Sequence, residues 1–149
     1  AYGHNQKAEA NYVPFSELIR SSDIITLHVP LTKDTFHMIS REQFGMMKQG
    51  AVLINTARGA LVDTQALVTA LEAGIIGSAA LDVLEGEEEI FYCDYTHKEL
   101  GHPFLPALQK MPNVIVTPHT AYYTEQVLID AVSNTIRNCL DFERSLNNG

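Results

Sequence analysis

The 149-residue sequence is poor in basic residues, with 10 Lys and Arg against 18 Asp and Glu and a formal net charge of −8. A nucleic-acid backbone is bound by clustered Lys and Arg side chains, so this balance argues against nucleic acid as a partner. The sequence also lacks the run of ~18–20 apolar residues that crosses a bilayer, and we expect no membrane partner. Its two cysteines, Cys93 and Cys139, have no metal-ligand spacing, which favours free thiols in a reducing cytoplasm and no bound metal.

Four apolar runs indicate strands, and their near-continuous character is typical of strands that are covered on both faces of a sheet. They lie at residues 23–29, 50–56, 75–83 and 113–117. Helical patterns with recognisable ends separate these runs. The alternation predicts an α/β protein built on a doubly wound parallel sheet.

Capping residues mark the ends of the predicted helices. Pro14 opens the first helical pattern at a first-turn position. Ser40 and Gln43 have the spacing of a capping box before the second. Asp63 can cap the third helix, and Gly74 is placed to end it.

The last part of the sequence has a different pattern. From Thr124 onward, apolar and small residues recur at steps of three and four, which predicts one long amphipathic helix with no strand after it. These residues are Leu128, Ala131, Val132, Thr135, Ile136, Cys139 and Leu146. We expect this helix to leave the sheet and to pack against something else.

In doubly wound sheets, ligands bind at the carboxyl ends of the strands. Four short segments with chemically useful side chains follow the predicted strands, at residues 28–30, 55–59, 81–87 and 117–120. Because the carboxyl ends of parallel strands meet at one edge of the sheet, we expect these segments to converge on one crevice.

Arg58 follows the second predicted strand and precedes Gly59. Its guanidinium group could form a structural ion pair, and it is also the side chain best suited to bind a substrate carboxylate through two parallel hydrogen bonds. Gly59 allows a tight turn in which backbone amides approach a ligand.

Acidic residues follow the third predicted strand. Asp82 and Glu87 lack further ligands at metal-site spacing, so a metal centre is not favoured. A carboxylate can instead hold one ring nitrogen of a histidine and stabilise the imidazolium form. The spacing alone does not choose the partner among Glu85, Glu87, Glu88 and Glu89, and a run of charges is by itself typical of a solvated loop.

His119 follows the fourth predicted strand in the segment TPHT. On its own it could be a structural histidine that hydrogen-bonds a neighbour. Together with a carboxylate it is a suitable proton donor for a ketone, so Arg58, a His–Glu pair and a cofactor crevice describe a 2-keto acid reductase. His28 is interpreted as structural, and His37 and His102 receive no role.

Three motifs resemble those of the D-isomer-specific 2-hydroxyacid dehydrogenases. They are NTARGALVDTQAL at 55–67, ALDVLEGEE at 80–88 and NVIVTPHTAYYTE at 113–125, and the resemblance spans about residues 12–141. Within the family the sequence is most similar to the D-lactate dehydrogenase branch, especially to the enzymes of vancomycin-resistance clusters, which supply D-lactate for altered peptidoglycan precursors. The implied fold is a Rossmann-type NAD-binding domain.

The resemblance assigns roles to individual residues. It implies that Arg58 binds the substrate carboxylate, that His119 is the acid/base, that Glu87 is its carboxylate partner, that Asp82 positions the nicotinamide carboxamide and that Tyr122 flanks the histidine. Further positions around the cofactor are Val29, Pro30, Thr35, Thr56 and Ala57.

Two departures from the family pattern matter. The GxGxxG unit that cradles the pyrophosphate does not occur in the sequence. The position where many relatives carry an acidic residue for the ribose corresponds to Gly3, with His4 and Lys7 nearby. NADPH is therefore considered equally with NADH.

From these departures we expect residues 1–119 to be a partial NAD(P)-binding domain and residues 120–149 to be a helix that returns to a substrate domain. The chain would then be the C-terminal portion of a longer enzyme, a homodimer when full length and inactive as this portion alone.

The expected reaction is the reduction of pyruvate to D-lactate. Hydroxyphenylpyruvate, 2-ketoisocaproate and glyoxylate are alternative small-molecule 2-keto acid substrates. A nucleotide-sensing corepressor, which is a protein-interaction module, and a truncated remnant that binds little are the alternatives outside this class.

Overall fold

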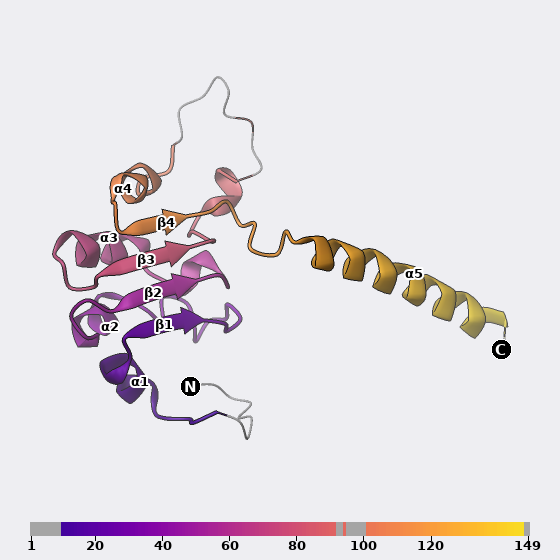
Figure 1. The fold of residues 1–149 in the computed structure, drawn as a ribbon, viewed down its shortest axis with the longest axis horizontal. Coiled ribbons are helices and arrows are strands. Elements are labelled where there is room, and N and C mark those ends of the chain that lie inside the picture. Colours follow the sequence, from indigo (N-terminus) through magenta and orange to yellow (C-terminus); the bar gives the residue numbers. More distant parts are fainter. Residues whose placement is uncertain (1–9, 92–93, 95–100, 148–149) are drawn as a thin grey trace. The chain divides into compact units, whose positions relative to one another are not determined.

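The computed structural model describes residues 10–91, 94 and 101–147, and the chain divides into two units, the first ending at His119 and the second beginning at Thr120. The helices and strands of the first unit are, in order, α1 (Phe15–Ser21), β1 (Ile24–Leu27), α2 (Arg41–Met46), β2 (Val52–Asn55), the 3₁₀ helix η1 (Gly59–Leu61), α3 (Thr64–Glu72), β3 (Ser78–Leu81), the 3₁₀ helix η2 (Glu87–Glu89), α4 (Leu105–Lys110) and β4 (Val114–Val116) (Figure 1). The second unit holds α5 (Glu125–Asn147).

The four strands form one parallel sheet in the order β1-β2-β3-β4. Their last residues are in register, since Leu27 pairs with Asn55, Asn55 with Leu81 and Leu81 with Val116. The loops that follow the strands therefore start along a single edge of the sheet. The four predicted strands and the parallel α/β class are confirmed.

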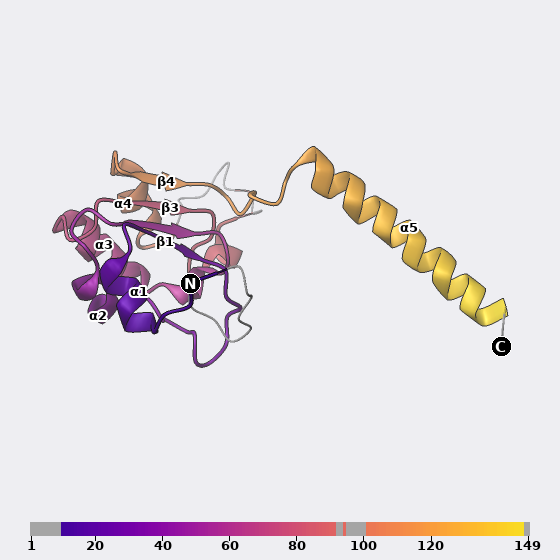
Figure 2. The same cartoon turned by 60° about the horizontal axis from the view of Figure 1, so that its bottom comes forward.

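Within the first unit, α1, α2 and α3 lie on the same face of the sheet, as Figure 2 shows. The strands are correspondingly buried on alternate residues, and Ile24 and Ile115 on the other face are 62% and 66% exposed. The expectation that both faces are covered is thus wrong for this part of the chain. Crossovers of one hand that add each strand in the same direction place their helices on the same face.

The predicted caps explain where the helices begin and end. The Asp63 side chain accepts a hydrogen bond from the backbone N–H of Ala66 at 2.9 Å, and Gly74 follows α3 in the left-handed region at φ +66°. The Gln43 side chain accepts a hydrogen bond from the backbone N–H of Ser40, as in a capping box. Pro14 stands at the N-cap of α1 rather than in its first turn.

The core of the first unit lies between the covered face of the sheet and these helices. Leu53 of β2 and Phe44 of α2 are fully buried, and Leu67 of α3 packs into the same cluster. Ile39 and Val62 form an isolated parallel bridge that joins the segment before α2 to the segment after η1. This core fixes the strands, and so the points at which the loops after them begin.

The predicted long helix is confirmed as α5, a 23-residue helix. Its apolar side chains remain exposed in the chain, among them Val132 and Ile136 at 60% and 55%. Cys139 on the same helix is a free, exposed thiol, whereas Cys93 lies outside the described residues. Among the helices that the structure describes, none combines the length and apolar character needed to cross a membrane.

Candidate active site

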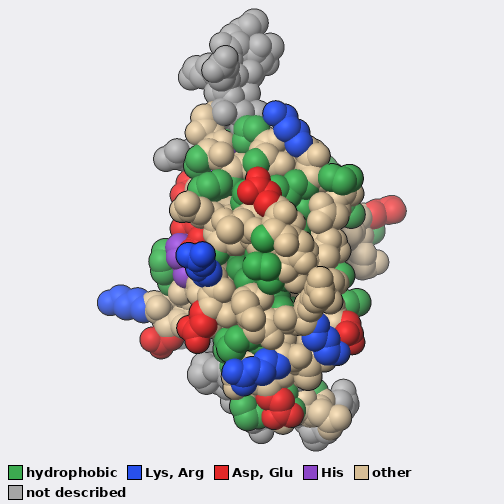
Figure 3. Space-filling model, turned by 90° about the vertical axis from the view of Figure 1, so that its left-hand side faces the viewer, with side chains coloured by type: hydrophobic (Ala, Val, Ile, Leu, Met, Phe, Trp, Pro, Cys, Tyr) green, Lys and Arg blue, Asp and Glu red, His purple; other side chains and the backbone are tan. Residues whose placement is uncertain are grey.

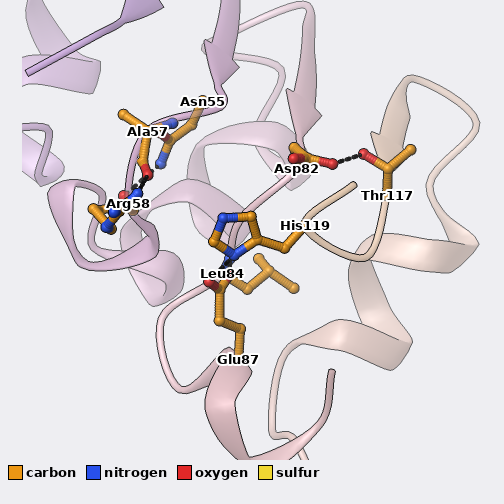
Figure 4. Close-up of polar contacts among 8 residues, drawn as sticks. All are labelled: Asn55, Ala57, Arg58, Asp82, Leu84, Glu87, Thr117 and His119. Carbon is orange, nitrogen blue, oxygen red and sulfur yellow. Dashed lines mark hydrogen bonds and ion pairs between the residues drawn. The ribbon is translucent and has the colours of Figure 1, made fainter. Parts of the chain in front are cut away.

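The loops after β2, β3 and β4 bring polar side chains together at the carboxyl edge of the sheet (Figure 4). Asn55 ends β2, Asp82 directly follows β3 and Thr117 directly follows β4. Arg58, Glu87 and His119 extend from the same three loops. Three of the four segments expected to converge, those after β2, β3 and β4, thus lie together at this edge.

The loop after β2 is organised by Asn55, which is 1% exposed. Its Nδ2 donates a hydrogen bond to the carbonyl oxygen of Arg58 at 2.9 Å, and its Oδ1 accepts one from the backbone N–H of Ala57 at 3.1 Å. Both polar ends of the buried amide are thus satisfied within the loop. The result is a fixed backbone at residues 57–58.

The Arg58 side chain, by contrast, is exposed, and its Nη1 donates to the carbonyl oxygen of Ala57 at 2.6 Å. No carboxylate among the described residues forms an ion pair with it. The structural ion pair considered from the sequence is not formed in this part of the chain. The remaining donors of the guanidinium group are therefore available to an anionic ligand.

Gly59 lies where the loops after β2 and β3 meet. Its φ is not in the left-handed region. A Cβ at this position would collide with the carbonyl group of Leu84 and the amide nitrogen of Glu85. The glycine therefore allows the backbone of the Arg58 loop to pack directly on the loop that carries Glu87.

Glu87 joins the loop after β3 to His119. Its Oε2 accepts a hydrogen bond from the backbone N–H of Leu84 at 2.6 Å, and its Oε1 lies 2.6 Å from Nδ1 of His119. Because a carboxylate only accepts, Nδ1 of the ring carries the proton in this contact. The Nε2 atom faces away from Glu87, and the pair is partly buried, with 31% of the His119 side chain and 16% of the Glu87 side chain exposed. The acidic run is therefore not simply a solvated loop.

The backbone of His119 is held as firmly as its ring. His119 has φ +53°, in the left-handed region that residues with a side chain rarely adopt. Its N–H donates to the carbonyl oxygens of Asp82, at 2.7 Å, and of Thr117, at 3.0 Å. A strained conformation of this kind persists only where surrounding contacts impose it, and such positions cluster at functional sites.

Asp82 is 4% exposed, and its Oδ1 accepts a hydrogen bond from the Thr117 hydroxyl at 2.6 Å. The loops after β3 and β4 are therefore joined by this contact as well as by the Glu87–His119 pair. In the view of Figure 4, the His119 ring lies between Arg58 on one side and Asp82 with Thr117 on the other.

An open groove of about 670 Å³ lies along the loops after β1 and β2. It is lined by His28, Val29, Pro30, Leu31, Thr56, Ala57 and Arg58. Four of the positions predicted to surround a cofactor thus share one groove with Arg58. The groove offers backbone and small side chains with one cationic group, which suits an extended ligand that carries negative charge.

The other predicted positions lie elsewhere. Thr35 does not line the groove. Its hydroxyl donates to the carbonyl oxygen of Pro30 at 2.7 Å and so holds the backbone of a residue that does line it. Tyr122 belongs to the second unit. Gly3, His4 and Lys7 lie outside the described residues. In the part of the chain that the structure describes, no group of three or more potential ligands could hold a metal ion.

Sequence reasoning gave no individual role to three residues that organise this site, Asn55, Thr117 and His37. A signal for Asn55 exists in the sequence, since it is a polar residue at the end of an apolar run. A buried amide must find hydrogen-bond partners, so such a residue is expected to organise the loop that follows. Thr117 was read only as part of a motif. His37 and Glu85 form a pair at 2.9 Å across 48 positions of sequence, which no local pattern reveals.

The family is established by comparison. The sequence profile of the D-isomer specific 2-hydroxyacid dehydrogenase, NAD binding domain, matches residues 2–121. The chain belongs to this family. The fold is accordingly a Rossmann-type NAD-binding domain.

Individual relatives agree with this result. The chain is 65% identical over 144 residues to a D-specific alpha-keto acid dehydrogenase of Enterococcus faecium, covering 97% of this chain and 45% of that relative. A crystal structure of D-lactate dehydrogenase with NAD+ from Lactobacillus jensenii matches with a TM-score of 0.86 and 40% identity, covering 90% and 40% of the two chains. The structure of D-2-hydroxyisocaproate dehydrogenase matches with a TM-score of 0.86 and 35% identity over 95% and 43%. The chain thus spans less than half the length of these relatives.

Proposed function

We propose that the protein carrying this chain reduces a 2-keto acid to the D-2-hydroxy acid with NADH or NADPH, and that pyruvate is converted to D-lactate. The observation that carries the proposal is the 2.6 Å contact between Nδ1 of His119 and Glu87 at the carboxyl edge of a parallel sheet. The groove lined by Arg58 begins at the same edge. A reductase of this kind needs these three parts, an acid, an anion-binding group and a cofactor groove.

The groove fits a dinucleotide. Val29, Pro30, Thr56 and Ala57 offer a narrow wall of backbone and small side chains, which suits a nicotinamide ribose lying against the ends of β1 and β2. Asp82 is placed one loop further along the edge, where a buried carboxylate would bind a carboxamide N–H. When bound, the reduced cofactor would supply a hydride to the carbonyl carbon of the substrate.

The chain's own residues would do the rest. Arg58 would bind the substrate carboxylate through two parallel hydrogen bonds and orient the keto group. Nε2 of the protonated His119 would give its proton to the carbonyl oxygen as the carbon is reduced, so the new hydroxyl group of the product is neutral while its carboxylate stays ionised. Glu87 would hold Nδ1–H throughout and stabilise the imidazolium form before the proton leaves.

Substrate choice is tested by comparing kcat/KM for pyruvate, 2-ketoisocaproate, hydroxyphenylpyruvate and glyoxylate in the natural full-length protein. We expect pyruvate to have the highest value and the product to be D-lactate. This would fit a role in remodelling peptidoglycan precursors for vancomycin resistance. A higher kcat/KM for a bulkier keto acid would make that acid, and not pyruvate, the proposed substrate. Formation of L-lactate would overturn the proposed stereochemistry.

Cofactor choice needs a separate measurement, because the relevant segment around Gly3 lies outside the described residues. Without a carboxylate there, a 2′-phosphate would meet no repulsion. We infer that both cofactors are used and expect kcat/KM for NADH and NADPH to agree within about tenfold. A larger preference for NADH would remove NADPH as a physiological cofactor.

We further infer that residues 120–149 belong to the substrate domain of a cytoplasmic homodimer. The exposed apolar side chains of α5 support packing against further protein. Light scattering of the natural full-length protein tests the dimer, and a monomeric mass would exclude it.

A further inference from the structure

A second histidine–glutamate pair lies beside the first on the loop after β3. Nε2 of His37 donates to Oε1 of Glu85 at 2.9 Å, and Gly86 alone separates Glu85 from Glu87. Gly86 adopts φ +79°, which turns the chain between the two carboxylates. Both pairs therefore extend from one short segment.

Glu85 is held from a second side by His102, which is 9% exposed. Nδ1 of His102 accepts the backbone N–H groups of Phe104, at 3.2 Å, and Leu105, at 2.9 Å, so this nitrogen carries no proton. Its Nε2 must then be the protonated atom, and it donates to the carbonyl oxygen of Glu85 at 2.9 Å. The backbone and the side chain of Glu85 are thus both fixed by histidines.

The conformation of His37 is itself unusual. It has φ +50°, one of two left-handed residues other than glycine among the described residues, and the other is His119. Its N–H donates to the carbonyl oxygen of Ala60 at 2.9 Å, and its ring stacks on Phe36. Strain of this kind is retained where the surrounding contacts require a particular side-chain direction, which here is toward Glu85.

His37 also belongs to the segment that leaves the cofactor groove. Val29 and Pro30 line that groove, Thr35 bonds the carbonyl oxygen of Pro30, and Met38 N–H donates to the carbonyl oxygen of Thr35 at 3.1 Å. The His37–Glu85 contact therefore links the groove segment to the segment that carries Glu87.

We propose that His37 is a positioning residue which, by holding Glu85, keeps Glu87 in place for His119 and couples that pair to the cofactor groove. The inference rests on the proposed function. An ordinary surface ion pair contributes little to stability. The chain offers such a pair in Lys48 and Asp23, whose side chains are 42% and 84% exposed, against 30% and 37% for His37 and Glu85. Figure 3 shows one face of the molecule, on which exposed Lys and Arg side chains lie near exposed Asp and Glu side chains.

The test uses Glu85→Leu, which fills much of the same space but offers no hydrogen-bond acceptor to His37, and His37→Asn, which tolerates the left-handed backbone but is too short to reach Glu85. In the natural full-length protein we expect kcat for pyruvate to fall about tenfold in each variant, while KM stays within roughly twofold. The double variant should be no slower than either single one, because the two residues act as a unit. Asp23→Asn, which removes the control pair, should leave kcat unchanged.

A background lacking Glu87 separates the possible results. If Glu85 acts through Glu87, Glu85→Leu causes no further loss of kcat in the Glu87→Gln protein. An additional tenfold loss there, or an unchanged kcat in the Glu85→Leu single variant, overturns the positioning role. If Glu87→Gln by itself leaves turnover unchanged, the proposed acid–base function fails, whatever the result at Glu85.

Discussion

The loop after β2 carries the positive charge of Arg58 and the loop after β3 the negative charge of Glu87. The two charged groups differ in how many of their atoms are already hydrogen-bonded within the protein. Arg58 on the first loop has a fixed backbone, held by Asn55, and a guanidinium group that donates to the neighbouring carbonyl oxygen of Ala57 and meets no carboxylate among the described residues. Glu87 on the second loop has both carboxylate oxygens engaged, one by Leu84 N–H and one by His119.

The difference follows from what each charge is proposed to do. A group that binds a substrate carboxylate must keep its donors available until the substrate arrives. A pair that moves a proton gains from being held in its reactive geometry beforehand, because less reorganisation then accompanies the reaction. Gly59 lies where the two loops contact each other. Because it has no side chain, the loop with the available guanidinium group packs directly on the loop with the fixed carboxylate.

The largest effect is expected from removing the proton-transfer side of this comparison, with His119→Gln. Loss of a general acid costs about 10²–10⁴-fold, so kcat for pyruvate should collapse. Binding of NADH, followed by the fluorescence of the bound nicotinamide, should stay nearly intact, because the groove does not include His119. Unchanged turnover would refute the proton-donor role.

Changing the anion-binding side with Arg58→Lys is expected to act on substrate binding. A hydrogen bond to a charged group contributes about 1.5–3 kcal/mol, and an ammonium group cannot reproduce the two parallel bonds, so kcat/KM for pyruvate should fall about 10- to 100-fold. Steady-state kinetics with pyruvate varied at saturating NADH measures this. If kcat and KM both survive the change, another group binds the carboxylate.

The contact between the two loops is broken by Gly59→Ala. The new methyl group would collide with backbone atoms of Leu84 and Glu85, and overpacking of this kind costs about 1–3 kcal/mol of unfolding free energy. Denaturant unfolding measures the loss.

Gly45→Ala is the matched control for that substitution. Gly45 lies inside α2 with no atom within 4 Å of an added Cβ. Its replacement should stabilise the protein by about 0.5–1 kcal/mol. Equal effects at the two glycines would show that Gly59 is not needed for close packing.

The smallest effect is expected from Thr117→Val, which removes the hydroxyl that donates to Asp82. A single hydrogen bond contributes about 0.5–1.5 kcal/mol net, so KM for NADH should rise by roughly two- to tenfold with kcat little changed. A selective fall in kcat instead would show that the contact acts on His119, whose N–H also bonds the backbone of Thr117 and Asp82.

Much of the fold could be predicted because its signals are local. Apolar runs marked the four strands, and Asp63 and Gly74 marked the ends of α3. The rule that ligands bind at the carboxyl ends of parallel strands singles out Arg58 and His119 from strand order alone. The placement of α1, α2 and α3 on one face of the sheet could not be predicted, because the composition of a strand does not record on which face the connecting helix lies.

The site was predictable only in part. Residue spacing left Glu85, Glu87, Glu88 and Glu89 as equal candidates to meet a histidine. The structure separates two of them by the turn at Gly86, which directs Glu85 to His37 and Glu87 to His119. The choice depends on backbone dihedral angles and on partners 48 and 32 positions away.

The sequence by itself determined the elements, their order and the chemical groups available at the ends of the strands, because periodicity, capping and strand order act over short distances. Only the tertiary structure decided that Gly59 packs on Leu84, that Asn55 fixes the backbone of Arg58 and that two histidines enclose Glu85. Most of these contacts join residues distant in sequence, and their geometry is set by how the sheet and helices pack together.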